Sequence, residues 1–199
     1  KDFMKNNIGI DALDFYVPPI ALKISDLALA RNIEPAKLEK GLGLKSMALM
    51  DVDEDAASMA ANALYKLIAN NNIDPKSVGR IYLGTESALD AAKPTATYAV
   101  GMVEEKLAKQ HGLRCFKNCD VVDMTFACVG AVDALENCID WIKSSSERKA
   151  IVIASDVAKY ELASTGEYTQ GAGAVAMLIS SNPSIISFNE TFGISMEHV

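Results

Sequence analysis

Short apolar runs alternate with longer stretches of helical periodicity along most of this 199-residue chain. The segments Gly79–Gly84 and Ala150–Ser155 are apolar and rich in β-branched residues, as strands buried on both faces are. The stretches around them, such as residues 55–72 and 95–111, are long enough for helices that cover a sheet. This alternation predicts an α/β fold in which helices cover a largely parallel sheet.

The two ends of the chain carry further strand patterns. Residues 8–17 alternate between apolar and polar side chains, and two prolines stop the pattern because proline cannot continue a hydrogen-bonded ladder. Near the other end, residues 171–180 and 184–192 predict two strands joined by a turn. We expect this pair to be an antiparallel addition to the sheet.

Capping residues mark the expected helix boundaries. Ser25 is expected to cap one short helix, and Pro35 suits the first turn of another. Asp55 is expected to open the long helix over residues 55–72, which a run of asparagines closes. A shorter strand pattern occurs at residues 44–51. The chain is therefore expected to form a single layered unit.

The stretch from Asp120 to Lys143 joins a strand pattern to a helix pattern through a cysteine. Cys128 follows the apolar pair Val121–Val122 and lies between small residues. Apolar side chains then recur at helical spacing, at Val132, Leu135, Ile139 and Ile142. The free N–H groups and the dipole of a first helical turn stabilise a thiolate, so Cys128 is a candidate nucleophile. A buried cysteine that packs as a small hydrophobe is the alternative.

Two carboxylates are also predicted at strand ends. Glu86 follows the strand pattern that ends at Gly84, and Asp156 follows the one that ends at Ser155. Because ligands gather at the carboxyl ends of parallel strands, both are expected near Cys128. A thiol beside a carboxylate suggests covalent acyl transfer with a nearby acid or base. The alternatives are a solvated loop carboxylate for Glu86 and a helix cap or turn former for Asp156.

Charge and hydropathy exclude two classes of partner. The net charge is −7, the isoelectric point is near 4.9, and no basic cluster interrupts the acidic balance along the sequence, which argues against a nucleic-acid surface. No apolar run approaches the roughly 18 residues of a membrane span, so no membrane partner is expected. Cys115 and Cys119 are four residues apart, unlike the ligands of a zinc knuckle, so we expect no metal site. The absence of secretory features predicts reduced thiols in a cytoplasmic protein.

At the candidate residues the sequence resembles a known family. The segments GTESALDAAK, TFACVGAVDAL, SDVAKY and TQGAGAVAML are similar to segments of the hydroxymethylglutaryl-CoA (HMG-CoA) synthases of the thiolase superfamily. WIKSSS and IEPAKL extend the resemblance over nearly the whole chain. The segments are specific together, although any one alone would be weak. The resemblance implies a thiolase-like, layered α/β half with a mostly parallel mixed sheet covered by helices.

The resemblance also implies roles for individual residues. Cys128 matches the nucleophile of the family, and Glu86 matches its general acid/base. Asp156, Tyr160 and Thr169 match positions that line or support the acyl pocket. The segment IEPAKL matches a region that touches the substrate and CoA, which implies binding roles for Glu34, Pro35 and Lys37. The implied substrates are acetyl-CoA and acetoacetyl-CoA, with no metal or redox cofactor, and the implied assembly is a homodimer.

The chain departs from the family pattern at three positions. Val129 replaces a usual aromatic residue after the cysteine, Leu44 replaces a common glutamine, and Tyr168 stands where proline is common. Val129 would reshape the acyl pocket, and a carrier-protein-bound substrate is therefore an alternative to a CoA-bound one.

The histidine that completes the catalytic set of the family has no match in this chain. His111 is expected to be a cap at a helix end, and His198 lies in no matching motif. We therefore expect residues 1–199 to be the N-terminal thiolase-like domain of a two-half enzyme, inactive by itself.

Two competing functions are retained. A β-ketoacyl carrier-protein synthase III-like enzyme also carries a nucleophilic cysteine before a helix, but it uses histidine and asparagine where this chain has the glutamate of GTES. A half-length binding or scaffold protein with a vestigial site is the other alternative.

Overall fold

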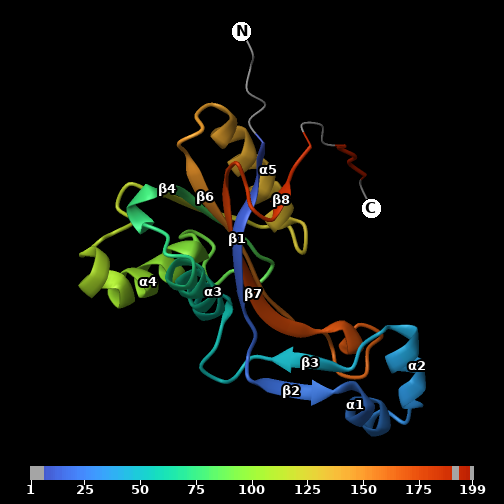
Figure 1. The fold of residues 1–199 in the computed structure, drawn as a ribbon. Helices are drawn as coiled ribbons and strands as arrows, with labels where there is room; N and C mark the ends of the chain where they lie inside the picture. Colours follow the sequence, from blue (N-terminus) through green and yellow to red (C-terminus); the bar gives the residue numbers. More distant parts are fainter. Residues whose placement is uncertain (1–6, 190–192, 198–199) are drawn as a thin grey trace.

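The fold was analysed in a computed structural model, which describes residues 7–189 and 193–197. A six-stranded sheet forms its centre, and a two-stranded sheet projects from it (Figure 1). The strands are β1 (Ile8–Tyr16), β2 (Ile20–Lys23), β3 (Ser46–Leu49), β4 (Val78–Gly84), β5 (Asp120–Met124), β6 (Lys149–Ala158), β7 (Gly171–Ser181) and β8 (Ile186–Ser187). The helices are α1 (Ile24–Ala30), α2 (Pro35–Gly41), α3 (Ala56–Asn70), α4 (Thr95–His111) and α5 (Gly130–Lys143), with short 3-10 turns η1 (Pro75–Ser77) and η2 (Glu167–Thr169).

The large sheet is mixed, and its order is β5-β4-β6-β7-β1-β8. Strands β5, β4 and β6 run parallel to one another, whereas β7, β1 and β8 add antiparallel pairs on the other side. The predicted α/β class, with helices covering a mixed sheet, is confirmed. The two final strands join the sheet as antiparallel additions, as predicted, and β8 pairs with β1. Residues 190–192 of the predicted last strand lie outside the described residues. Both edges of β7 are already occupied by β6 and β1, so β8 can attach only to the free edge of β1.

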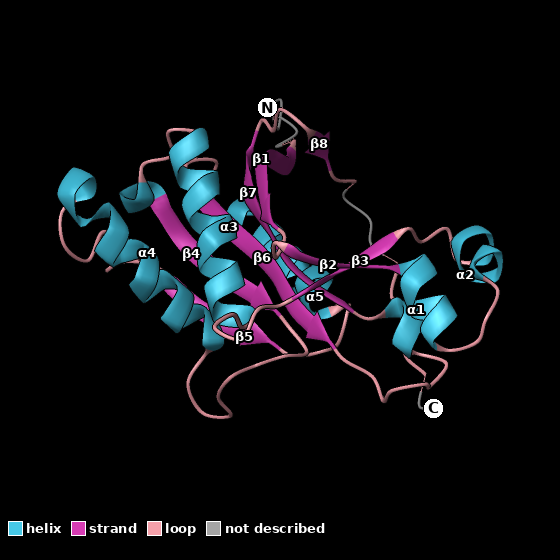
Figure 2. Cartoon of the chain, turned by 90° about the horizontal axis from the view of Figure 1, so that it is seen from below, coloured by secondary structure: helices cyan, strands magenta, loops and turns pink. Residues whose placement is uncertain are grey.

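Helices cover the sheet on both faces (Figure 2). On one face α3 and α4 enclose a core with β4 and β6, in which Leu64, Leu67 and Ile81 are fully buried. On the other face α5 packs over the same strands through Ile139 and Ile142. The apolar periodicity seen in the sequence therefore marks the faces that these helices bury.

Helix α3 begins and ends where the sequence predicts. The carboxylate of Asp55 accepts a hydrogen bond from the Ser58 N–H at 2.7 Å, and the Ser58 hydroxyl accepts one from the Asp55 N–H at 2.9 Å. This reciprocal capping box satisfies two donors that the helix cannot satisfy internally. At the other end, Asn71 is the C-cap and Asn72 adopts a left-handed conformation with φ 51°.

Strands β2 and β3 with helices α1 and α2 form the projecting arm, which has a small apolar core of its own (Figure 1). The predicted cap at Ser25 is wrong, because α1 starts at Ile24 and Lys23 is the N-cap. Strand β2, which the sequence did not predict, runs directly into α1. The side chain of Ile24 is fully buried in the arm core, and this burial fixes the start of the helix.

Candidate active site

The three parallel strands end at one level. Gly84 at the end of β4 pairs with Met124 of β5 on one side and with Ala154 of β6 on the other. The candidate residues lie close to these ends: Glu86 lies just past β4, Cys128 lies between β5 and α5, and Asp156 lies near the end of β6. The predicted convergence of these residues at one sheet edge is therefore found.

Two glycines bring the end of β4 against the start of α5. A Cβ atom on Gly84 would collide with the backbone of Gly130 and Ala131. A Cβ atom on Gly130 would collide with the carbonyl oxygen of Met124. Because only glycine permits this approach, the backbone segments that carry Glu86 and Cys128 lie side by side.

Asp156 fixes the segment that carries Glu86. Its Oδ1 atom accepts hydrogen bonds from the Thr85 hydroxyl at 3.0 Å and from the Glu86 N–H at 2.6 Å. Thr85 is fully buried, and its hydroxyl also accepts a bond from the Ser87 N–H at 2.9 Å. Ser87 in turn exchanges hydrogen bonds with the backbone of Val157. Asp156 thus belongs to β6 and acts across the sheet edge, so the cap or turn role expected as an alternative is wrong.

A further carboxylate at this edge was not predicted. Asp123 in β5 accepts hydrogen bonds from the N–H groups of Thr95 at 2.5 Å and Ala96 at 2.9 Å. It thereby satisfies two free donors in the first turn of α4 and ties that helix to the strand that leads to Cys128. The pairing joins residues far apart in sequence, so no local signal could have revealed it.

Cys128 lies in a tight turn and is exposed. The Phe126 carbonyl accepts hydrogen bonds from the N–H groups of Val129 at 2.9 Å and Gly130 at 3.0 Å. Ala127 adopts a positive φ of 39°, which is uncommon for a residue with a side chain and is often found at functional sites. Cys128 is therefore not the buried packing residue of the alternative interpretation, and its thiol is open to a ligand.

Two hollows adjoin the end of β6, and Glu86 lines the first of them. The first has a volume of about 220 Å³ and is lined by Glu86, Ser87 and Val157–Tyr160. The second, of about 320 Å³, shares Val157–Tyr160 and continues to Leu49 and Gln170. Both are therefore bounded by the residues that end β6, and Tyr160 faces each of them. The ring of Tyr160 rests on Gly166, where an added Cβ would lie 2.9 Å from its Cγ atom.

The loop that carries Thr169 is anchored to the arm. Arg31, the C-cap residue of α1, donates two hydrogen bonds to the buried carboxylate of Glu167, at 2.6 and 2.8 Å, and the Ala163 N–H donates a third at 3.0 Å. The Arg31 hydrogen bonds hold the pKa of Glu167 below its usual value. Thr169 itself is exposed, and its hydroxyl donates to the Gly166 carbonyl at 2.9 Å. Its neighbour Gln170 lines the second hollow.

The remaining predicted residues lie apart from this edge. Glu34, Pro35 and Lys37 are at the start of α2 in the arm, which projects away from β4 in both views (Figures 1 and 2). The arm also contains an open hollow of about 720 Å³. Its lining includes three lysines that the sequence did not single out: Lys23, Lys40 and Lys45. Their spacing has no motif, so only the pairing of β2 with β3 reveals the cluster.

The described residues contain neither a candidate metal cluster nor a candidate membrane-spanning helix. Within that part of the chain, no group of three or more His, Cys, Asp and Glu side chains is arranged to hold a metal ion. No helix there is both long and apolar enough to cross a membrane. His111 ends α4, as predicted, whereas His198 lies outside the described residues.

Comparison with known proteins identifies the family. Residues 4–184 match the family model for the N-terminal part of hydroxymethylglutaryl-coenzyme A synthase. The chain belongs to the HMG-CoA synthase family. It is 37% identical to the hydroxymethylglutaryl-CoA synthase of Haloferax volcanii over 94% of its length, and 36% identical to that of Enterococcus faecalis over 92%. It spans only 42% and 45% of those relatives, respectively.

Solved structures of the family share the fold. The structure of MvaS in complex with 3-hydroxy-3-methylglutaryl coenzyme A matches with a TM-score of 0.82 and 38% identity, over 90% of this chain and 41% of that one. An HMG-CoA synthase complexed with CoA matches with a TM-score of 0.77 and 32% identity, over 89% of this chain and 42% of that one. The thiolase-like architecture expected from the sequence is thereby confirmed, and this chain corresponds to the N-terminal portion of its relatives.

The structure also places the departures from the family pattern. Leu44 and Tyr168 both pack against the apolar core of the arm. Their substitution therefore changes the packing of the arm rather than the sheet edge that carries Glu86. Val129 is different, because it immediately precedes α5 next to Cys128, and 44% of its surface is exposed. Of these three positions, Val129 is the one beside the candidate nucleophile.

Proposed function

We propose that the protein containing this chain condenses acetyl-CoA with acetoacetyl-CoA to give 3-hydroxy-3-methylglutaryl-CoA, with Cys128 as nucleophile and Glu86 as general acid/base. The observation that carries the proposal is the contact of Gly84 with Gly130, which sets the segments bearing Glu86 and Cys128 side by side. The names of the relatives and the HMG-CoA bound by MvaS support it.

The first step is acyl transfer to Cys128. Its thiolate attacks the thioester carbonyl of acetyl-CoA, a new C–S bond forms to the enzyme, and the bond to the CoA sulfur breaks. Coenzyme A leaves as a thiol after taking up a proton. The exposed position of Cys128 allows an extended substrate to reach it. The backbone N–H of Cys128 is a candidate to stabilise the oxyanion.

The second step is carbon–carbon bond formation. Glu86 removes a proton from the methyl group of the acetyl-enzyme, and the resulting carbanion adds to the ketone of acetoacetyl-CoA. Protonation of the new alkoxide and attack by water on the enzyme thioester release the product and restore the Cys128 thiol. The hydrogen bonds from Thr85 and Glu86 to Asp156 give the Glu86 backbone the fixed position that this proton transfer requires.

The other predicted residues fit binding roles. Asp156, Tyr160 and Thr169 are proposed to shape the acyl pocket, since Tyr160 lines both hollows at the end of β6 and Glu86 lines the first of them. Glu34, Pro35 and Lys37 are proposed to contact CoA, and the lysine-lined hollow of the arm supplies positive charge for its phosphates. The chemistry needs CoA thioesters as substrates and no metal or redox cofactor. The third catalytic group, a histidine, is proposed to come from a second half of the protein.

A cytoplasmic homodimer is proposed as the working form. Strand β5 is at one edge of the described sheet, and exposed apolar side chains gather near it, including Phe126 at 63% and Val132 at 60% exposure. Apolar side chains at a sheet edge favour association. Light scattering on the full-length protein tests the assembly, and a monomer at micromolar concentration would contradict it.

The catalytic proposal is tested by acetyl labelling of the full-length protein. With radiolabelled acetyl-CoA, the wild type should retain label and Cys128→Ala should lose it. Glu86→Ala should keep the label but form no product with acetoacetyl-CoA. Loss of labelling in Glu86→Ala would assign Glu86 a structural role, and unlabelled wild type would favour a scaffold protein.

A second acyl source is favoured by one structural relative. The HMG synthase of the curacin biosynthetic pathway, in complex with an acetyl donor carrier protein, is 28% identical and matches with a TM-score of 0.79. The same labelling experiment with an acetylated carrier protein compares the two donors directly. Faster labelling of Cys128 from the carrier protein than from acetyl-CoA would reassign the donor. Condensation with malonyl carrier protein would instead indicate a β-ketoacyl synthase.

A further inference from the structure

A hollow of about 290 Å³ lies at the opposite end of the parallel strands from Glu86. Three segments form its walls: the turn η1 with the first residue of β4, the last residue of α4, and the chain from Gly112 to Asn118. Gly112 and Arg114 both have positive φ values, 83° and 54°, so the chain curls around the hollow instead of continuing the helix.

The hollow is lined by the cationic or hydrogen-bonding side chains of Lys76, His111, Arg114, Lys117 and Asn118, together with Val78, Leu113 and Cys115. Among the described residues, no ion pair involves Lys76, Arg114 or Lys117. Two carboxylates lie close to the hollow and accept hydrogen bonds from its backbone: Asp74 accepts from the Lys76 N–H at 3.0 Å, and Glu104 accepts from the Phe116 N–H at 2.7 Å. Within the described part of the chain, the positive charge of the hollow is therefore not neutralised by an ion pair.

This concentration of positive charge is unexpected in a chain whose net charge is −7. In the sequence, β4 and α4 separate Lys76 from His111, Arg114 and Lys117, so the four side chains do not occur in one stretch. The fold brings η1 against the end of α4 and creates the cluster. Cationic side chains that converge on a concave surface are the usual means of binding phosphate groups.

We propose that this hollow binds a small, soluble ligand that carries phosphate groups. A volume near 290 Å³ is at the lower end of ligand pockets, so the ligand is the size of a diphosphate or a small phosphate ester. Arg114 and Lys117 contact the anion, and Lys76 and the His111 imidazole close the opposite wall. Val78 begins β4 within the same hollow, so an occupant touches the amino end of the strand whose carboxyl end leads to Glu86.

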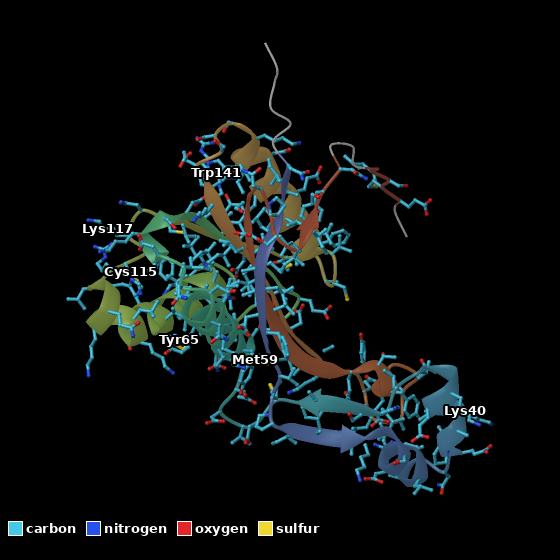
Figure 3. All side chains as sticks on the ribbon, viewed as in Figure 1. Lys40, Met59, Tyr65, Cys115, Lys117 and Trp141 are labelled. Atoms are coloured by element: carbon cyan, nitrogen blue, oxygen red, sulfur yellow. The ribbon has the colours of Figure 1, made fainter. Side chains whose placement is uncertain are left out.

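The site is separate from the CoA site proposed for the arm. Lys117 and Cys115 lie at one end of the molecule, and Lys40 of the arm hollow lies at the other (Figure 3). The inference therefore does not depend on the condensation chemistry. Anion binding at this hollow can therefore be measured independently of catalysis.

Binding is measured on the full-length protein by titration calorimetry with sodium pyrophosphate at constant ionic strength. Hydrogen–deuterium exchange locates the site, and peptides that cover residues 109–119 should become protected. The double variant Arg114→Ala/Lys117→Ala should bind at least about tenfold more weakly, since each charge-assisted contact contributes a severalfold factor. Lys109→Ala is the matched control, because Lys109 is in the last turn of α4, next to His111, but does not line the hollow. This variant should bind pyrophosphate within about twofold of the wild-type affinity.

Three results would overturn the proposal. One is equal pyrophosphate affinity in the wild type and the double variant. Another is protection confined to the arm, which would assign the anion to the lysines at 23, 40 and 45. The last comes from sedimentation with phosphatidylglycerol vesicles: a protein that binds vesicles through Arg114 and Lys117 but does not bind pyrophosphate recognises a lipid surface.

Discussion

The edge that carries Glu86 and Cys128 and the arm that carries Glu34 and Lys37 are built in different ways. The edge is fixed by strand register, by the contact of Gly84 with Gly130, and by hydrogen bonds between neighbouring strands. The arm has a two-stranded sheet, two helices of one to two turns, and its own small core. It is joined to the loop before β7 by the Arg31–Glu167 pair and by Tyr168.

The two regions are accordingly suited to different tasks. The proposed proton abstraction and thioester attack require atoms held within a fraction of an ångström, and the close backbone packing of Gly84 against Gly130 suits that requirement. Binding the polar part of a long substrate tolerates adjustment. A small arm with few anchoring contacts can supply it, because regions with little buried surface open at low free-energy cost.

The largest expected change in stability comes from adding a side chain where Gly84 packs against the start of α5. Gly84→Ala should lower the free energy of unfolding by about 3 kcal/mol or more, because its Cβ would meet the backbone of α5, which cannot move aside. Urea unfolding followed by circular dichroism measures the change. Gly101→Ala is the control: an added Cβ in α4 meets nothing within 4 Å, and alanine should stabilise the helix by about 0.5–1 kcal/mol. Equal stability of Gly84→Ala and wild type would refute the close approach.

The rate of thiol modification should differ greatly between exposed Cys128 at the sheet edge and buried Cys138 in the interior. Burial raises the pKa values of Cys119 and Cys138 to about 12, so near pH 8 only about one in ten thousand of these thiols is ionised. Iodoacetamide should therefore modify Cys128 more than about a hundredfold faster than Cys138, as mass spectrometry of tryptic peptides would show. Rapid modification of Cys138 in the folded protein would mean that the face under α5 is open.

A smaller effect is expected from the cap of α3. Asp55→Ala removes one half of the capping box and should cost about 1 kcal/mol in urea unfolding. Ser25→Ala in the arm should change the stability by less than about 0.3 kcal/mol, because Ser25 is inside α1 and caps nothing. Equal destabilisation of the two variants would contradict the assignment of a side-chain cap to α3 and none to α1.

The smallest effect on global unfolding is expected at the junction of arm and loop. Arg31→Met should speed hydrogen exchange in α1 and the loop before β7 severalfold, while exchange in β4 stays unchanged. Because Arg31 lowers the pKa of Glu167, the pair stabilises the fold fully above the ordinary glutamate pKa, and its contribution is lost as the pH falls through the lowered value. The difference between variant and wild type should thus shrink in acid. Faster exchange throughout the sheet would show that arm and edge unfold as one unit.

The sequence was most informative where a feature depends on neighbours along the chain. The alternation of apolar runs and helical stretches predicted the α/β class, and Asp55 and the asparagines predicted both ends of α3. The motifs around Glu86 and Cys128 predicted the family. Even the convergence of three reactive residues came from local patterns, since parallel strands that end at the same level bring the residues after them to one edge.

The sequence failed where a feature depends on distant partners. The cap at Ser25 was wrong because burial of Ile24 in the arm core, not a local hydrogen bond, sets the start of α1. The two terminal strands were predicted as antiparallel additions, but the sequence could not show that β8 pairs with β1, which is distant in the chain. The basic hollow escaped detection because the fold brings Lys76 of η1 against the segment after α4, and β4 and α4 separate the two in the sequence.

The amino-acid order by itself thus determined which elements form and which residues end them, because capping, periodicity and motif spacing act over a few residues. Only the tertiary structure decided that Asp156 supports the Glu86 segment across the sheet and that Asp123 anchors α4. It also decided that Cys128 is exposed while Cys138 is buried. These outcomes depend on which strands become neighbours, and strand order is set by burial of the whole core and not by any single segment.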